Sequence, residues 1–265
     1  MHYDDYRYLL FERRANGVLA ITINRPEKLN AANNALHREL AQIWLTIKTD
    51  PTVRVAVITG AGRAFCAGGD LNEEIEKLGK IDPIISMGEG ALEIVYNMIN
   101  LDKPIISAIN GPAAGAGLAV ALTADISIIA EEARITDAHV NIGVASGDHA
   151  VMMWPLFCGI PKAKLYLLTA DLLDGREAER IGLVSMCKPL SELLPAAYEL
   201  AERLGAKPQR AVQWTKRCLN HWLRQAAPIF DLSVAYEGLN FMEPDAREGL
   251  EAFLQKRSPQ FPSNR

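Results

Sequence analysis

The sequence predicts an α/β fold followed by a helical C-terminal region. Short apolar segments alternate with amphipathic ones up to about residue 190, a pattern typical of a sheet covered by helices. Helical periodicity dominates after that point. A chain of 265 residues is long enough to bury one substantial core. We expect the core over residues 1–204 and a helical region over residues 205–265.

The first elements are predicted with clear boundaries. Tyr8–Arg13 and Val18–Asn24 have the composition of two strands, and the Ala-Asn-Gly sequence between them favours a hairpin. Leu36–Ile47 repeats apolar residues at the spacing of one buried helix face. Val53–Thr59 is predicted to be a buried strand.

Two turns rich in glycine and alanine come next. Residues 64–71 are interpreted as a strand end with glycines ahead of a helix, and residues 103–125 as the buried strand Pro104–Ala108, a small-residue turn and a helix. Amide N–H groups in the first turn of a helix lack intrahelical acceptors and lie at the positive end of its dipole. They are therefore able to hold a carbonyl oxygen that gains negative charge, as in an oxyanion hole. A close-packed structural turn is the alternative.

The remaining elements complete the pattern. Asp82–Leu101, Asp174–Arg180 and Leu193–Leu204 are predicted helices, and Ile126–Ile129 a predicted strand. The uncharged segment at residues 104–124 has the length of a membrane span, but asparagine, proline and three glycines interrupt it.

Composition excludes several classes of function. A net charge of −4 and a pI near 5.8 argue against a nucleic-acid-binding protein, which needs a basic face. The first residues lack the pattern of a signal peptide, so we expect a cytoplasmic protein without membrane association. The four cysteines are far apart and have no histidines at zinc spacing, which predicts reduced thiols and no metal site.

Several motifs, in this order, carry a family resemblance over nearly the entire chain. They are Asn24-Arg25-Pro26, Leu29-Asn30-Ala31, Ala64-Phe65-Cys66-Ala67-Gly68-Gly69-Asp70-Leu71, Lys103-Pro104, Asn110-Gly111, Gly115, Gly117, Asp125, Leu168-Thr169, Ala178, Ile181-Gly182-Leu183-Val184, and the tail from Glu248-Gly249 to Arg257. The chain resembles the crotonase (enoyl-CoA hydratase/isomerase) superfamily.

The resemblance implies a crotonase-like spiral of repeated ββα units and a C-terminal helical region that builds a homotrimer or a hexamer made of two trimers. It implies an acyl-CoA substrate, with coenzyme A as part of that substrate and no other cofactor. The oxyanion hole would consist of the backbone N–H groups of Gly69 and Ala116. The residues expected to bind the substrate and its CoA are Arg25, Lys28, Ala67, Asp70, Leu71, Gly115 and Lys256.

The sequence departs from the family pattern at the two glutamates with which typical hydratases deliver water. Ala119 and His139 stand at those positions. Hydration by the usual mechanism is therefore in doubt, because general acid-base assistance contributes about 10²–10⁴-fold. His37, His139 and Asp148, with Trp154-Pro155, resemble the pattern of the superfamily's β-diketone hydrolases, which act without CoA.

Each of these side chains also has a structural interpretation. His37 fits a helix surface, Asp148 fits the cap of a helix that starts near Ala150, and Asp70 fits the cap of the helix that follows it. Asp137, Glu89 and Glu93 are further carboxylates that a pocket can use.

The sequence therefore predicts a crotonase-fold enzyme acting on an acyl-CoA through an oxyanion intermediate, with Asp148 and His139 transferring protons. The alternatives are a CoA-independent β-diketone hydrolase and a catalytically silent oligomer that binds acyl-CoA. The apolar residues of the C-terminal region are expected to pack on other subunits; they are Trp214, Leu219, Trp222, Phe230, Leu239 and Phe241.

Overall fold

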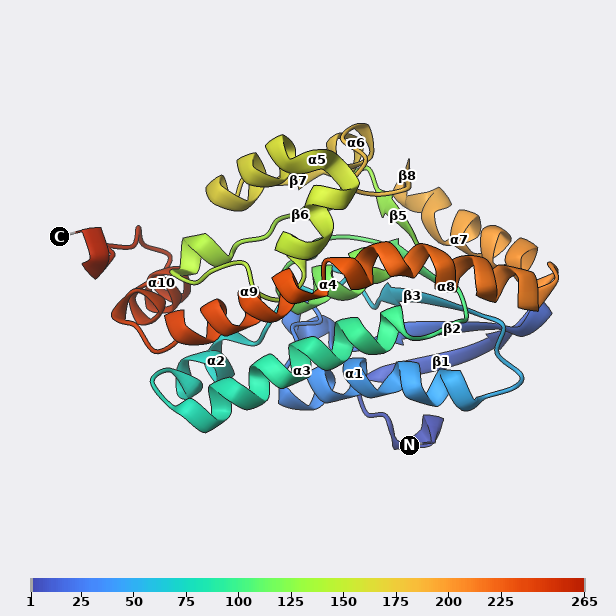
Figure 1. The fold of residues 1–265 in the computed structure, drawn as a ribbon, viewed down its shortest axis with the longest axis horizontal. Helices are drawn as coiled ribbons and strands as arrows, with labels where there is room; N and C mark the ends of the chain where they lie inside the picture. Colours follow the sequence, from blue (N-terminus) through green and yellow to red (C-terminus); the bar gives the residue numbers. More distant parts are fainter. Residues whose placement is uncertain (1, 265) are drawn as a thin grey trace.

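A computed structural model describes residues 2–264 and contains a six-stranded sheet flanked by helices (Figure 1). The strand order is β1-β2-β3-β4-β5-β8, with β1 antiparallel to β2 and the other neighbours parallel. The bounds are β1 Leu9–Arg14, β2 Val18–Ile23, β3 Val55–Gly60, β4 Ile105–Ile109, β5 Ile126–Ala130 and β8 Met186–Lys188. Strands β3 and β4 are buried along their whole length, which explains their uninterrupted apolar sequences. The predicted α/β class and the first hairpin are confirmed.

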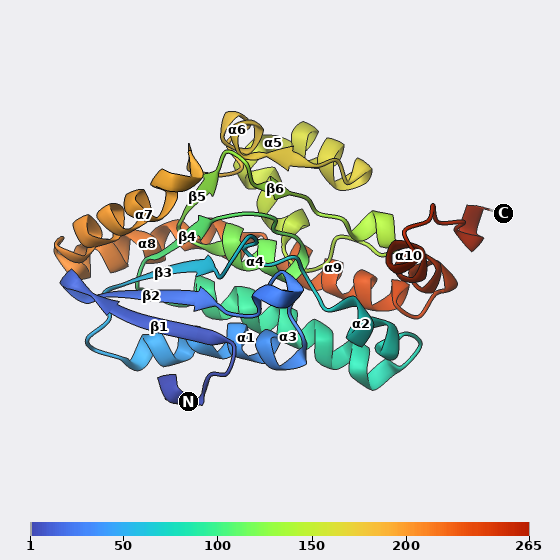
Figure 2. The ribbon, with the colours of Figure 1, turned by 180° about the vertical axis from the view of Figure 1, so that it is seen from behind.

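Helices cover this sheet and extend beyond it (Figure 2). The bounds in the first 205 residues are α1 Asn34–Thr49, α2 Leu71–Lys77, α3 Ile81–Ile99, α4 Gly115–Thr123, α5 Ala150–Thr169, α6 Gly175–Arg180 and α7 Leu190–Gly205. Helix α1 packs on α3, and α7 packs on β3, β4 and β5. Asn33 begins α1 because its side chain accepts a hydrogen bond from the Leu36 N–H at 2.9 Å. No helix within residues 2–264 has the combined length and apolar character needed to cross a membrane.

A second layer of short parallel bridges lies beyond the ends of the main strands. Ala32 pairs with Gly69, while Ala113 pairs with both Cys66 and Ile135. Strands β6 (Arg134–Ile135) and β7 (Leu173–Asp174) extend this layer. The strand end expected at residues 64–71 is therefore reduced to isolated bridge pairs, since the chain turns again after two or three residues. This layer brings the two small-residue turns side by side.

The C-terminal region runs back along the molecule and packs on helices that precede it in the chain. It consists of α8 (Gln209–Gln225), α9 (Ala227–Asn240) and α10 (Pro244–Gln255). Helix α9 packs on α3 and α5, and α10 packs on α2, so segments far apart in sequence lie together (Figure 1). Phe230 and Phe241 are buried in these contacts, so the expectation that they face other subunits is wrong.

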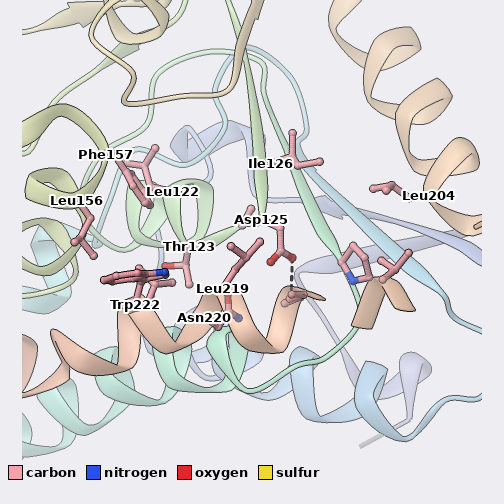
Figure 3. A pocket seen from close by; sticks show the side chains of 15 residues that line it. Leu122, Thr123, Asp125, Ile126, Leu156, Phe157, Leu204, Leu219, Asn220 and Trp222 are labelled. Carbon is pink, nitrogen blue, oxygen red and sulfur yellow. Dashed lines mark ion pairs between the residues drawn. The ribbon is translucent and has the colours of Figure 1, made fainter. Parts of the chain in front are cut away.

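The other apolar residues of the C-terminal region that were expected to pack on other subunits are exposed. Trp214, Leu219, Trp222 and Leu239 are each between 59% and 65% accessible to solvent. Leu219 and Trp222 line a groove of about 610 Å³ between α8 and the start of β5, where Leu156 and Phe157 form the opposite wall (Figure 3). Lys216 and Asp125 form an ion pair of 2.7 Å in this groove.

Candidate active site

The turns that contain Gly69 and Ala116 lie against each other. The N–H of Ala114 donates to the Cys66 oxygen at 3.1 Å, which fixes the second turn beside the first. Gly115 has a φ of 45°, and a Cβ on it would lie only 3.4 Å from the α-carbon of Gly68. Glycine therefore allows both the left-handed backbone and the close approach at this point.

The N–H of Gly69 is available because of the parallel bridge in which the residue takes part. In that bridge Ala32 donates to the Gly68 oxygen at 2.7 Å, and Asp70 donates to the Ala32 oxygen at 3.0 Å. A parallel ladder uses the groups on either side of the paired residue, so the N–H of Gly69 points away from Ala32. Within residues 2–264 it has no hydrogen-bond acceptor.

The N–H of Ala116 is available for a different reason. Ala116 is the second residue of α4, where amides precede the first intrahelical bonds. The N–H groups of Gly117 and Leu118 already bond the Ala114 oxygen, whereas Ala116 has no acceptor in the described part of the chain. Two free donors thus come together at the positive end of a helix, the arrangement that an oxyanion requires.

Asp148 lies next to these turns. Its Oδ2 would be 3.6 Å from a Cβ on Gly115, and its Oδ1 is 2.6 Å from Nδ1 of His149. Trp154 donates from Nε1 to Nε2 of His149 at 3.4 Å, so His149 presents a proton to Asp148. Asp148 does not cap α5, because His149 occupies the capping position. The expectation that Asp148 caps this helix is therefore wrong.

His139 lies in the same cluster and is held by a second carboxylate. Its Nδ1 is 2.8 Å from Oδ1 of Asp137, which also accepts from the Ser146 hydroxyl at 2.7 Å. Its Nε2 is 3.7 Å from Oδ2 of Asp148. Burial alone lowers the pKa of His139, but the charges of Asp137 and Asp148 outweigh burial and raise that pKa well above its usual value. A protonated imidazole therefore faces the Asp148 carboxylate.

Two glutamates that the sequence analysis missed reach this cluster. Oε1 of Glu237, on α9, is 3.5 Å from Nε2 of His139. Glycine at position 147 leaves room for the Glu237 carboxyl, because a Cβ there would lie 2.1 Å from Oε2. Glu74, on α2, has its carboxyl against Gly69, where a Cβ would lie 1.6 Å from Oε1. No motif marks either residue.

His37 faces the cluster from α1 and is only partly exposed. Its imidazole lies against Gly90 of α3, where a Cβ would be 2.8 Å from Nδ1. Burial and the charge of Lys77 lower the pKa of His37 to about 4, although Asp148 acts in the opposite direction. His37 is therefore neutral at physiological pH. Glu89 and Glu93, by contrast, are exposed on α3.

The residues expected to bind CoA occupy varied environments. Arg25 donates to Oδ2 of Asp70 and to the Ala31 oxygen, at 2.8 and 2.9 Å, so its charge is already paired. Asp70 also caps α2 by accepting from the Asn72 N–H, as predicted. Lys28 and Lys256 are exposed.

The other two expected substrate contacts, Ala67 and Leu71, are half-buried beside the first turn. Leu71 packs on a small apolar cluster that joins α2 to α10. Both residues lie two positions from Gly69 in the chain.

Three side chains that form a close group of possible metal ligands already take part in hydrogen bonds. One atom each from Asp137, Asp148 and His149 lies within 4.8 Å of the others. Asp148 and His149 already bond each other, and Asp137 bonds His139 and Ser146 through its Oδ1. The absence of a metal site remains a prediction from the sequence.

This geometry agrees with the comparisons to known proteins. A family model described as enoyl-CoA hydratase/isomerase matches residues 13–264. The chain belongs to the enoyl-CoA hydratase/isomerase family. Its fold is that of the crotonase superfamily: a solved structure described as an enoyl-CoA hydratase/isomerase from Mycobacterium paratuberculosis has a TM-score of 0.85 and 35% identity, covering 92% of this chain and 97% of that one.

Relatives in this enoyl-CoA hydratase/isomerase family have different names. The 1,2-epoxyphenylacetyl-CoA isomerase of Escherichia coli is 34% identical over 92% of this chain and 95% of its own length. The 2,3-dehydroadipyl-CoA hydratase of the same organism is 33% identical, over 95% and 98%. A crotonyl-CoA hydratase of Syntrophomonas wolfei is 32% identical, over 97% and 98%. Isomerases and hydratases thus resemble this chain to similar degrees, and the family alone does not choose the reaction.

Proposed function

We propose that this member of the enoyl-CoA hydratase/isomerase family binds an acyl-CoA thioester, stabilises its enolate with the N–H groups of Gly69 and Ala116, and moves a proton with Asp148. The observation that carries the proposal is the presence of two unpaired backbone donors beside Oδ2 of Asp148, a carboxylate oxygen that accepts no hydrogen bond and faces His139 at 3.7 Å. Relatives named for epoxyphenylacetyl-CoA, dehydroadipyl-CoA and crotonyl-CoA support the thioester class.

The proposed proton transfer uses the side chains in distinct ways. Asp148 accepts the proton from C2 of the thioester as the enolate oxygen forms against the two N–H groups. The protonated His139, held by Asp137, lies 3.7 Å from Asp148 and offsets the negative charge around it. The proton on Asp148 then returns to another carbon, which makes an isomerisation. No metal or separate cofactor takes part in this proposal.

We favour a proton shift over hydration by the glutamate pair that is usual in the family. Ala119 offers no acid, is 2% exposed and packs in the main core, so a water molecule has no carboxylate partner there. His139 occupies the other position and is already bonded to Asp137.

Cleavage of a carbon–carbon bond in a free β-diketone is the second candidate function. The contact between Nε2 of His139 and Oδ2 of Asp148 favours it. A histidine and a carboxylate that lie this close together are able to activate a water molecule. A silent acyl-CoA-binding oligomer is the third candidate. It would bind the same ligands without exchanging a proton.

A thermal-shift comparison tests the ligand class. A ligand that binds only the folded protein at 100 times its dissociation constant stabilises it by about 2.7 kcal/mol, which raises the melting temperature by roughly 5–10 °C. We expect crotonyl-CoA and longer acyl-CoAs to give this shift. A shift with cyclic β-diketones alone would replace the acyl-CoA proposal with the hydrolase.

We also propose that the chain assembles as a trimer or a pair of trimers through its C-terminal helices. The exposed side chains of Leu219 and Trp222 in the α8 groove support this assembly (Figure 3). Trp222→Ala should shift the assembly toward monomer in light scattering, whereas Trp214→Ala, on the same helix outside the groove, should have a smaller effect. A wild-type monomer at micromolar concentration would contradict this proposal.

A further inference from the structure

The two oxygens of the Asp148 carboxylate face different histidines. Oδ1 lies 2.6 Å from Nδ1 of His149, whereas Oδ2 lies 3.7 Å from Nε2 of His139 and would be 3.6 Å from a Cβ on Gly115. A nitrogen and an oxygen 2.6 Å apart share a hydrogen bond, while 3.7 Å is beyond hydrogen-bond distance. One oxygen of the proposed base is thus held, and the other lies free beside the second small-residue turn.

Trp154 determines which nitrogen of His149 carries the proton. The indole nitrogen only donates, and in Trp154 it lies 3.4 Å from Nε2 of His149 and points its N–H at it, so Nε2 must accept. The proton of the ring is therefore on Nδ1, which donates it to Oδ1 of Asp148. Tyr166 packs against Trp154, with 6.4 Å between the ring centres, and helps to hold the indole in place.

The His149 side chain does not cap the helix that it precedes. His149 occupies the capping position of α5, but only its backbone oxygen contributes there, by accepting from the N–H groups of Met152 and Met153. Both His149 and Trp154 are fully buried. A ligand therefore does not touch His149, and any influence of this side chain on the reaction acts through Asp148.

No other hydrogen bond fixes the Asp148 carboxylate within residues 2–264. The Ser233 hydroxyl of α9 donates to the Gly147 oxygen at 3.1 Å and anchors the backbone just before Asp148, but the side chain still has two torsion angles. The bond from His149 is short and involves a charged acceptor, so it is strong enough to restrict both angles. Without it, the carboxylate would turn and present either oxygen at changing distances.

We propose that His149 is a positioning residue, which holds Oδ1 of Asp148 so that Oδ2 alone exchanges the proton with C2 of the acyl-CoA. This inference rests on the proposed acyl-CoA function. Oδ2 takes the proton as the electron pair of the C2–H bond moves into the enolate, and the proton later returns from Oδ2 to another carbon. His149 itself neither gains nor loses a proton. Its contribution is geometric, since a displacement of about 1 Å can cost about 10²-fold in rate.

Three substitutions of His149 test whether the donor on Nδ1 is what matters. The amide nitrogen of asparagine is as many bonds from Cβ as Nδ1, so His149→Asn should keep the hydrogen bond and most of the turnover. The amide of glutamine is one bond further away and leucine has no donor, so kcat should fall about 10–100-fold in His149→Gln and His149→Leu. The dissociation constant for the acyl-CoA should hardly change. His221→Leu, the same change at an exposed histidine of α8, should leave kcat unchanged.

NMR of the histidine ring nitrogens tests the direction of the hydrogen bonds in the free wild-type protein. Nδ1 of His149 should be protonated and Nε2 unprotonated, the pattern that donation from Trp154 imposes. Protonation of Nε2, alone or together with Nδ1, would contradict the arrangement. This measurement needs neither a substrate nor a variant, so it decides even if His149→Leu does not fold.

Two kinetic results would overturn the role of His149 while leaving the acyl-CoA function intact. One is wild-type turnover in His149→Leu. The other is equal turnover in His149→Asn and His149→Gln, which would show that the position of the donor does not matter. If wild-type protein turns over no acyl-CoA, the proposed function itself fails, and the role of His149 fails with it.

Discussion

The two turns at Gly69 and Ala116 differ from the side-chain cluster that faces them in how they are built. The turns offer backbone N–H groups that a parallel bridge and a helix start leave unpaired. The cluster gathers side chains from α2, α9 and the segment before α5, and its charges depend on one another. A backbone site is fixed by the fold itself, whereas a side-chain site can be changed one residue at a time. We therefore expect substitutions in the cluster to change the reaction more readily than they remove the two donors.

Removing one backbone donor should have the largest effect. Ala116→Pro deletes the N–H at the second position of α4, where proline is tolerated by the helix. Turnover should fall about 10²–10³-fold, the usual loss for one oxyanion donor. The measurement is kcat on the best acyl-CoA, with circular dichroism to verify folding. Ala116→Ser retains the N–H and should keep most of the turnover; an equal loss in both variants would show that side-chain size, not the donor, matters.

Replacing the proposed base should have the next largest effect. Asp148→Asn should lower turnover by about 10²-fold, because acid-base assistance is lost. The affinity for CoA thioesters should hardly change, since the carboxylate contacts no phosphate in the proposed complex. Comparing kcat with the dissociation constant separates the two effects. A variant with wild-type turnover would transfer the role of base to another residue of the cluster.

Changing a residue that acts through His139 should have the smallest effect. Asp137 raises the pKa of His139, so Asp137→Asn should lower that pKa. A protonated His139 contributes stability that is lost as the pH rises through its folded-state pKa, and the loss should therefore begin at lower pH in the variant. Turnover should fall about tenfold, less than after removal of the base itself. Melting temperatures across a pH series and NMR titration of His139 measure both changes; identical profiles would contradict the coupling.

Much of the fold was predictable because local sequence determines it. The hairpin of β1 and β2, the face of α1 and the strand β4 follow from short-range patterns, and each was found within about two residues of its predicted bounds. The bridge pairs around Cys66 were not predicted, because two-residue pairings leave no periodic signal.

The candidate site was likewise predictable only where local sequence determines it. The turns of Gly69 and Ala116 were located from their glycine and alanine content. Glu74 and Glu237 were missed because they are far apart along the chain, and only the fold brings their side chains close together. Phe230 and Phe241 were misassigned to the surface for the same reason, since only the packing of α9 and α10 decides which of their apolar residues are covered.

Deuterium exchange at C2 of 3-butenoyl-CoA in D₂O, followed by NMR, tests the central claim most directly. An enzyme that holds the enolate between Gly69 and Ala116 should introduce solvent deuterium at C2 well above the enzyme-free rate. Ala116→Pro should slow this exchange about 10²–10³-fold. If the thioester binds in the thermal-shift assay but wild-type protein adds no deuterium, the chain forms no enolate and the proposed chemistry is contradicted.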